Sequence, residues 1–139
     1  MVKRVERSTL VVFAFIPEEQ RLDARYTLKK NSDFRRLYSK GKSAVTPYLV
    51  LYSKRNGHKE KRAGFTVSVK LGHAVTRNRI RRQLRAVYRL NSDAIRPGTD
   101  VVIVARSRCI GADFHVMEAA FLSACGKLGI LVKEDGEDA

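Results

Sequence analysis

Residues 62–85 read RAGFTVSVKLGHAVTRNRIRRQLR, and the periodicity of this stretch changes near its middle. Over 62–70 apolar and polar residues alternate, which predicts a strand with one buried face. From 75 to 90 the apolar residues recur every three or four positions, which predicts an amphipathic helix. The chain is therefore expected to pack at least one helix against a sheet.

Two more helices are expected on either side of this stretch. Asn31 or Ser32 can cap the start of the first, and Gly41 suits a left-handed end for it. The last helix is expected to start at 111–113 and to end at Gly129. Its apolar stripe consists of Phe114, Met117, Phe121, Ala124, Cys125 and Leu128.

Two more strands complete the expected domain. In 44–53 the alternation places Tyr48 and Tyr52 on one face, and the segment is expected to pair antiparallel with 62–70 because a polar loop joins them. Residues 101–105 form a continuous apolar run, which is typical of a buried strand. The order is helix, two or three strands, helix, strand, helix, and it predicts an α+β fold with helices layered on a small sheet.

Positive charge is the outlying feature of the composition. The 139 residues include 28 Lys and Arg against 14 Asp and Glu, a net charge of +14. Between Glu60 and Asp93 there is no acidic residue at all. Charge concentrated in this way indicates a polyanionic partner better than it indicates a generic basic protein.

The helix over 75–90 is expected to carry its positive charge on the side opposite to its core-facing residues. On a helical wheel Ile80, Leu84, Val87 and Tyr88 share one side, and the arginines occupy the other. No acid is available there for salt bridges, and like charges four residues apart repel. Arginine suits phosphate because its planar fork donates paired hydrogen bonds. A membrane surface is a weaker alternative, because a small core needs the apolar side of the helix.

The quoted stretch resembles the signature of the bacterial ribonuclease P protein family. The family's Arg-Asn-Arg triplet after a Gly-x-Ala-Val turn is matched by Arg77-Asn78-Arg79. Residues 28–41 resemble the family's opening helix, 97–106 resemble its buried strand, and the likeness extends over about 26–130. It implies an α-β sandwich like domain 2 of ribosomal protein S5, with a left-handed βαβ crossover that departs from the usual handedness.

The resemblance implies two RNA-binding surfaces. The residues that match the surface for the catalytic RNA subunit are Arg77, Asn78, Arg79, Arg81, Arg82, Arg85 and Arg89. Those that match the surface for the single-stranded 5′ leader of precursor tRNA are Phe34, Tyr38, Tyr52, Thr66, Ser68 and Lys70. Tyr48 is added to this surface because the alternation places it on the face of Tyr52. Aromatic rings suit this role because unpaired bases stack on them. Two positions depart from the family: Val69 stands where many relatives are basic, and His73 stands where asparagine is common.

The same resemblance implies that the RNA subunit, with Mg²⁺, cleaves the precursor tRNA. The protein is expected to have no catalytic or metal-binding residue, since its three histidines are scattered and its cysteines are not at metal-ligand spacing. Two alternatives remain open. One is a ribosomal-type structural RNA-binding protein, and the other is a DNA-binding regulator, for which a recognition turn and a dimer interface are lacking.

The domain is expected to span 26–132, between a flexible N-terminal extension (1–25) and an acidic, disordered tail (133–139). No apolar run reaches the length of a membrane span. Leu10–Ile16 is a short apolar run without a clear signal-peptide cleavage site. Two cysteines indicate free thiols in a reducing compartment, so a cytoplasmic location is expected.

Overall fold

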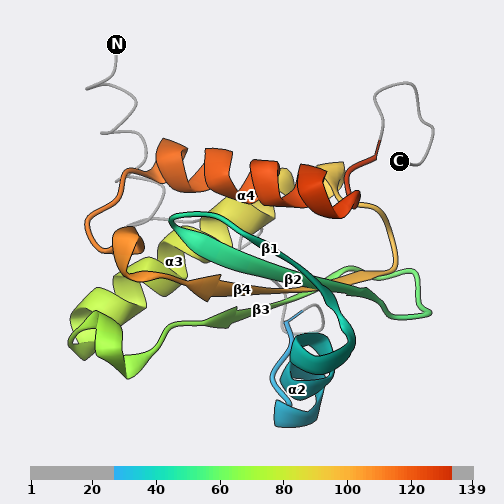
Figure 1. The fold of residues 1–139 in the computed structure, drawn as a ribbon, viewed down its shortest axis with the longest axis horizontal. Helices are drawn as coiled ribbons and strands as arrows, with labels where there is room; N and C mark the ends of the chain where they lie inside the picture. Colours follow the sequence, from blue (N-terminus) through green and yellow to red (C-terminus); the bar gives the residue numbers. More distant parts are fainter. Residues whose placement is uncertain (1–26, 133–139) are drawn as a thin grey trace.

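The computed structural model describes residues 27–132, in which a four-stranded sheet lies between helices (Figure 1). The strand order is β1-β2-β4-β3. β4 is antiparallel to β2 and parallel to β3. The strands are β1 (Lys42–Val45), β2 (Leu49–Arg55), β3 (Arg62–Thr66) and β4 (Thr99–Ala105).

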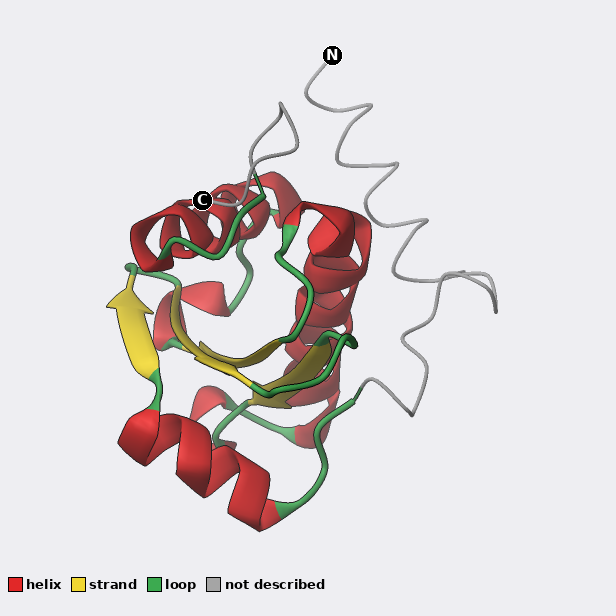
Figure 2. Ribbon diagram, turned by 90° about the vertical axis from the view of Figure 1, so that its right-hand side faces the viewer, coloured by secondary structure: helices red, strands yellow, loops and turns green. Residues whose placement is uncertain are grey.

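Helices cover the two faces of the sheet unequally (Figure 2). α3 (Ala74–Asn91) and α4 (Phe114–Leu128) enclose the main core on one face. α2 (Asn31–Lys40) closes a smaller cluster on the other face, around Leu37 and Val102. The α+β class and the order of elements are confirmed, with three strands before α3.

The expected antiparallel pairing of 44–53 with 62–70 is wrong, because β4 lies between β2 and β3. Val101, Val102 and Ile103 are each fully buried, so β4 is apolar on both faces. Such a strand is most stable in the centre of a sheet, where both edges and both faces are covered. The β3-α3-β4 unit is the parallel crossover that the resemblance describes as left-handed.

The segment 44–53 is two strands and not one. Thr46 forms the break: its hydroxyl donates to the carbonyl of Leu49 and accepts from the amides of Tyr48 and Leu49. Pro47 fits here because it has no amide hydrogen to donate to a ladder. The turn resets the alternation, which changes the face on which Tyr48 lies.

The strand expected over 62–70 ends early, at Thr66. The Ser68 hydroxyl accepts a hydrogen bond from the Lys70 amide and begins a 3-10 turn over Val69–Leu71. Gly72 follows at φ 133° and leads into α3. Ser68 and Lys70 therefore do not continue the sheet face to which Thr66 belongs.

The helix ends agree with the sequence in part. The predicted side-chain cap of α2 is wrong, since the helix begins at Asn31 and no side chain caps it. Gly41 is extended, not left-handed, and is needed for space: a Cβ there would lie 2.6 Å from the Leu37 carbonyl oxygen. Gly129 ends α4 in the predicted left-handed conformation, at φ 68°.

The predicted core faces of α3 and α4 are confirmed. Ile80, Leu84, Val87 and Tyr88 are buried in α3. In α4 every predicted stripe residue is buried except Leu128, which is partly buried against the core. The expectations for 1–25 and 133–139 lie outside the described residues. Within 27–132 no helix is long and apolar enough to cross a membrane.

Candidate nucleic-acid interface

The arginine face of α3 is set by the core beneath it. Because Ile80, Leu84 and Val87 point into the main cluster, the opposite side of the helix faces outward. The arginine face comprises Arg77, Asn78, Arg79, Arg81, Arg82, Arg85 and Arg89. Arg79 and Arg82 are exposed, while Arg77, Arg81 and Arg89 are partly buried.

Three contacts hold parts of this face in place. Arg77 donates through Nε to the Gly72 carbonyl at 3.1 Å, which joins the helix to the turn before it. Arg81 donates to the Asn78 side chain at 3.0 Å, so the asparagine of the triplet orients an arginine one turn later. The guanidinium of Arg85 lies 5.9 Å from the centre of the Phe65 ring, within cation–π distance.

The arginines from 77 to 85 have no anionic partner in the described part of the chain. No carboxylate between 27 and 132 is within salt-bridge distance of the arginines from 77 to 85. Desolvation and the neighbouring charge of Arg81 lower the pKa of Arg85, yet an arginine stays charged at neutral pH. The face therefore gathers mutually repelling cations, which a row of phosphates would neutralise.

A second surface lies across the sheet, where α2 meets β2 and β3. We call Phe34, Tyr38, Tyr52 and Thr66 the aromatic patch. The rings of Tyr38 and Tyr52 meet edge to face at 4.9 Å, and Phe34 lies 6.3 Å from Tyr38. The hydroxyls of Tyr38 and Thr66 share a hydrogen bond of 2.7 Å, which ties the helix to the sheet. Tyr38 is 39% exposed, so its ring is available to a ligand.

Gly64 was not singled out from the sequence but shapes the aromatic patch. A Cβ at this position would lie 2.6 Å from the tip of the Phe34 ring. The strand can therefore hold Phe34 against the sheet only because residue 64 has no side chain. A glycine inside a strand is the signal that could have found it, since it often marks a close approach.

A row of residues extends the aromatic patch across all four strands. The register places Val45 beside Val50, Val50 beside Val104, and Val104 beside Thr66. Val45 is 55% exposed, and the two central valines are partly buried. This sheet face is thus mostly apolar, with hydroxyls at one side, which suits unpaired bases.

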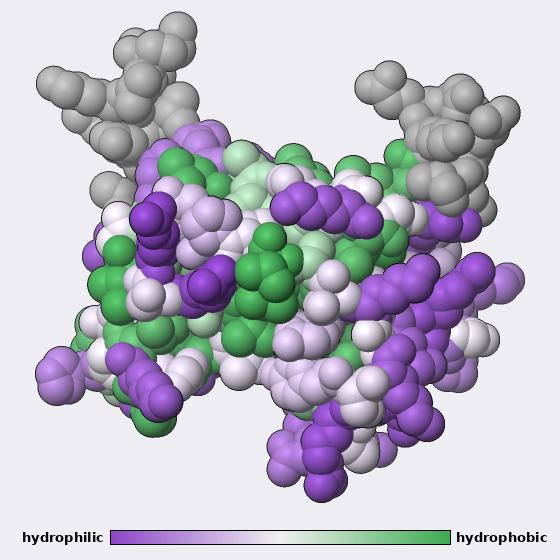
Figure 3. Space-filling view, viewed as in Figure 1, coloured by the Kyte–Doolittle hydropathy of each residue, from purple (hydrophilic) through white to green (hydrophobic). Residues whose placement is uncertain are grey.

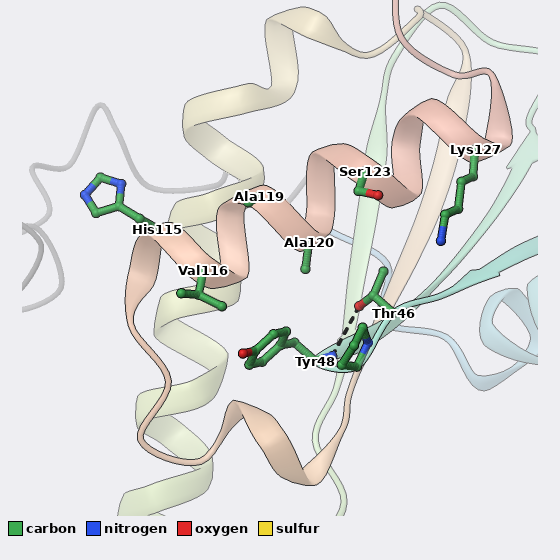
Figure 4. Close-up of a pocket in the computed structure, with 9 residues that line it drawn as sticks. Thr46, Tyr48, His115, Val116, Ala119, Ala120, Ser123 and Lys127 are labelled. Atoms are coloured by element: carbon green, nitrogen blue, oxygen red, sulfur yellow. Dashed lines mark hydrogen bonds between the residues drawn. The ribbon is translucent and has the colours of Figure 1, made fainter.

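Tyr48 lies on the wrong side of the sheet for this surface. It packs against the main core with α4, and its carbonyl accepts hydrogen bonds from Arg106 and Cys109. Figure 4 shows its ring beside Val116 and Ala120, at a largely apolar pocket of about 490 Å³. The prediction that Tyr48 and Tyr52 share a face is therefore wrong, because the turn at Thr46 resets the alternation.

The remaining predicted residues lie between the two surfaces. Ser68 and Lys70 are exposed in the 3-10 turn that links β3 to α3. Val69, one of the departures from the family pattern, is 73% exposed beside Lys70. His73 is also exposed and precedes α3 without capping it through its side chain. Two surfaces are assembled, and this turn connects them.

The acidic residue in β4 already has partners. Asp100 is buried, accepts two hydrogen bonds from Arg62 at 3.0 and 2.6 Å, and accepts a third from Asn56. These bonds raise the pKa of Arg62. Within residues 27–132 no three potential metal-ligating side chains gather.

Comparison with known proteins agrees with this geometry. The family model for ribonuclease P matches residues 22–129. The ribonuclease P protein component of Alkaliphilus oremlandii is 40% identical over 104 residues, which cover 75% of this chain and 91% of the relative. That of Clostridioides difficile is 49% identical over 88 residues, covering 63% and 77%.

Solved structures show the same fold. The ribonuclease P protein of Staphylococcus aureus superimposes with a TM-score of 0.69 at 30% identity, covering 76% of this chain and 96% of that one. The protein from Thermotoga maritima gives a TM-score of 0.65, also at 30% identity, covering 70% and 92%. Fold, family model and relatives agree. The chain therefore belongs to the ribonuclease P protein family, whose members are the protein subunit of the enzyme that matures the 5′ end of tRNA.

Proposed function

We propose that the arginine face binds the ribonuclease P RNA and that the aromatic patch binds the 5′ leader of precursor tRNA. The observation that carries this division is the placement of the two surfaces on opposite sides of one thin sheet. Phe65 and Thr66 are neighbours in β3, but Phe65 lies under Arg85 while Thr66 bonds to Tyr38. One protein can therefore hold two RNAs at once.

The chemistry of each surface supports its assigned partner. Arginines without acidic neighbours bind a folded RNA through its phosphates, with little dependence on base sequence. The aromatic patch offers rings and hydroxyls, and a single strand stacks its bases on such rings whatever their identity. A leader differs in sequence from one tRNA to another, so a sequence-tolerant surface is suited to it.

The division of labour in the enzyme follows from these surfaces. The protein adds affinity for the substrate and neutralises phosphates of the RNA subunit, so less Mg²⁺ is needed to fold that RNA. The Mg²⁺ that the reaction requires is held by the RNA, which carries out the cleavage. The protein acts in the cytoplasm, where tRNA precursors are made.

Multiple-turnover cleavage of precursor tRNA by a bacterial ribonuclease P RNA at low Mg²⁺ tests the proposal. The reaction is run with and without the protein, on substrates with a long and with a very short leader. Strong stimulation that depends on leader length is expected. Stimulation without leader dependence would remove the role of the aromatic patch and leave that of the arginine face.

A ribosomal-type structural RNA-binding protein is the second candidate. Such a protein would bind RNA through the arginine face, but it would not require exposed aromatic rings on the other side of the sheet. If the protein binds the RNA subunit and leaves turnover unchanged at low Mg²⁺, this second candidate is favoured.

A further inference from the structure

A cluster of cations surrounds a pocket that belongs to neither surface. Its volume is about 350 Å³, and it lies where the end of β2, the start of β4 and the end of α4 meet. The basic residues around it are Lys40, Lys42, Lys54, Arg55 and Arg96. Figure 3 shows hydrophilic side chains gathered at this end of the molecule, near the C-terminal end of α4 in Figure 1.

The cationic pocket is separate from both surfaces already described. None of its lining residues belongs to α3 or to the aromatic patch. Ser53 and Thr99, which line it, share the sheet face of Leu51 and Val101, whereas Tyr52 and Val102 face the aromatic patch. Lys54 lies on the face of Tyr52 and Lys40 ends α2, so the pocket lies at an end of the sheet and shares no residue with the aromatic patch.

The described residues that line the pocket include no Asp or Glu. Asp100 follows Thr99 in the chain, but its carboxylate is taken up by Arg62 and Asn56. Ser53 and Thr99, each 5% exposed, bring hydroxyl groups to the pocket wall. Cations around a concave site with hydroxyls on its wall are the donors that a phosphate group requires.

The C-terminal end of α4 disfavours an anion in the pocket, because the helix dipole is negative there. The C-terminal end of α4 contributes about half a negative charge. Its carbonyls at Cys125 and Gly126 already accept hydrogen bonds from Ile130 and Gly129, which reduces that effect. Even without Arg96, the four positive side chains of Lys40, Lys42, Lys54 and Arg55 outweigh the remainder.

We infer that the cationic pocket is a third RNA contact, which binds a backbone phosphate outside the arginine face and the aromatic patch. The inference rests on the proposed function for the RNA partners. The phosphate belongs either to the RNA subunit or to the precursor tRNA, since both present the same group. A protein with this contact holds its RNA at both ends of the sheet.

The test uses a pocket variant, Lys42→Gln/Lys54→Gln/Arg55→Gln, and a control variant that removes the same charge elsewhere. The control is Lys59→Gln/Arg108→Gln/Lys127→Gln, three exposed positions outside the pocket and both surfaces. A third protein, Lys42→Arg/Lys54→Arg/Arg55→Lys, keeps the charge of the pocket. Unchanged thermal unfolding midpoints show that each variant is folded.

Two binding arms distinguish the source of the phosphate. The first measures the protein against the RNA subunit, and the second measures precursor tRNA against the holoenzyme assembled at saturating protein, each over a range of salt. In one arm the pocket variant should bind about tenfold more weakly than the control, with a salt slope smaller by about two. The charge-preserving variant should recover most of the affinity.

Equal affinities and salt slopes for the pocket and control variants in both arms would overturn the inference. That outcome differs from a failure of the proposed function, in which the unmodified protein itself would not bind the RNA subunit or stimulate cleavage.

Discussion

The arginine face comes from one continuous segment of the chain, whereas the aromatic patch is assembled from segments far apart in the sequence. The arginine face lies on one helix, and its spacing is a local property of about four turns of chain. The aromatic patch is assembled from α2, β2 and β3, and its hydrogen bond joins residues 28 positions apart. The first surface tolerates movement, because charge acts over several ångströms. The second depends on ring positions, which only the folded sheet provides.

The two surfaces are joined by β3 and the turn after it. Phe65 supports Arg85 on one side, and Thr66 holds Tyr38 on the other. Because the two surfaces are separate, the proposed function predicts that binding of either RNA can be lost while binding of the other is kept. Substitutions that affect one interaction and spare the other therefore test the comparison.

The largest effect is expected from Arg79→Gln/Arg81→Gln/Arg82→Gln. Glutamine keeps the helix propensity but removes three of the proposed phosphate contacts. Affinity for the RNA subunit should fall by roughly two orders of magnitude, with a salt slope smaller by about two to three. The measurement is the dissociation constant of the protein and the RNA subunit between low and moderate salt. The Lys59→Gln/Arg108→Gln/Lys127→Gln variant is the control, and equal losses in both would mean that only net charge matters.

A smaller and more selective effect is expected from Tyr38→Ala. Loss of one stacking ring should weaken binding of a long-leader precursor to the holoenzyme by about tenfold, since stacking contributes about 1–3 kcal/mol per base. A precursor with a very short leader should bind as before. Tyr38→Phe removes only the hydrogen bond to Thr66 and should retain most of the affinity. If both substitutions were equally harmful, the hydrogen bond and not the ring would be responsible.

Gly64→Ala should reproduce part of that loss without touching a proposed ligand contact. The new methyl group would meet the Phe34 ring at 2.6 Å, so the ring must shift away from the sheet. Affinity for the long leader should fall a few-fold, and unfolding free energy should decrease by about 1–2 kcal/mol. Titration with long-leader precursor, together with denaturant unfolding, measures both. Unchanged leader affinity would show that the position of Phe34 is unimportant.

No effect on the leader is expected from Tyr48→Ala, the same substitution as Tyr38→Ala on the other sheet face. Tyr48 packs with α4, so its loss should lower the unfolding free energy by about 2 kcal/mol. The ratio of long-leader to short-leader affinity should stay at its original value. A drop in that ratio would place Tyr48 in the leader surface after all, against the described sheet geometry.

What the sequence predicted correctly is mostly local. The buried side of α3, the arginine side opposite it and the left-handed end at Gly129 each follow from residues within a few turns of one another. The apolar run of 101–105 also predicted a buried strand, which the structure confirms as β4. Helical periodicity and composition determine such features without reference to the rest of the chain.

What the sequence did not predict is non-local. Insertion of β4 between β2 and β3 depends on which strand gains most by burial on both faces, and alternation within one segment does not reveal that. The face of Tyr48 depends on a turn at Thr46 that interrupts an otherwise regular pattern. The cationic pocket brings together residues from Lys40 to Ile130, so no short segment of the sequence reveals it.

The most direct test of two separate RNA surfaces is a ratio measured on assembled enzyme. Dissociation constants for long-leader and short-leader precursors are determined at protein concentrations that saturate the RNA subunit, for the unmodified protein, Tyr38→Ala and Arg79→Gln/Arg81→Gln/Arg82→Gln. The ratio should collapse toward one for Tyr38→Ala and stay unchanged for the arginine variant. A ratio that falls equally in both variants would contradict the division of the protein into an RNA-subunit face and a leader face.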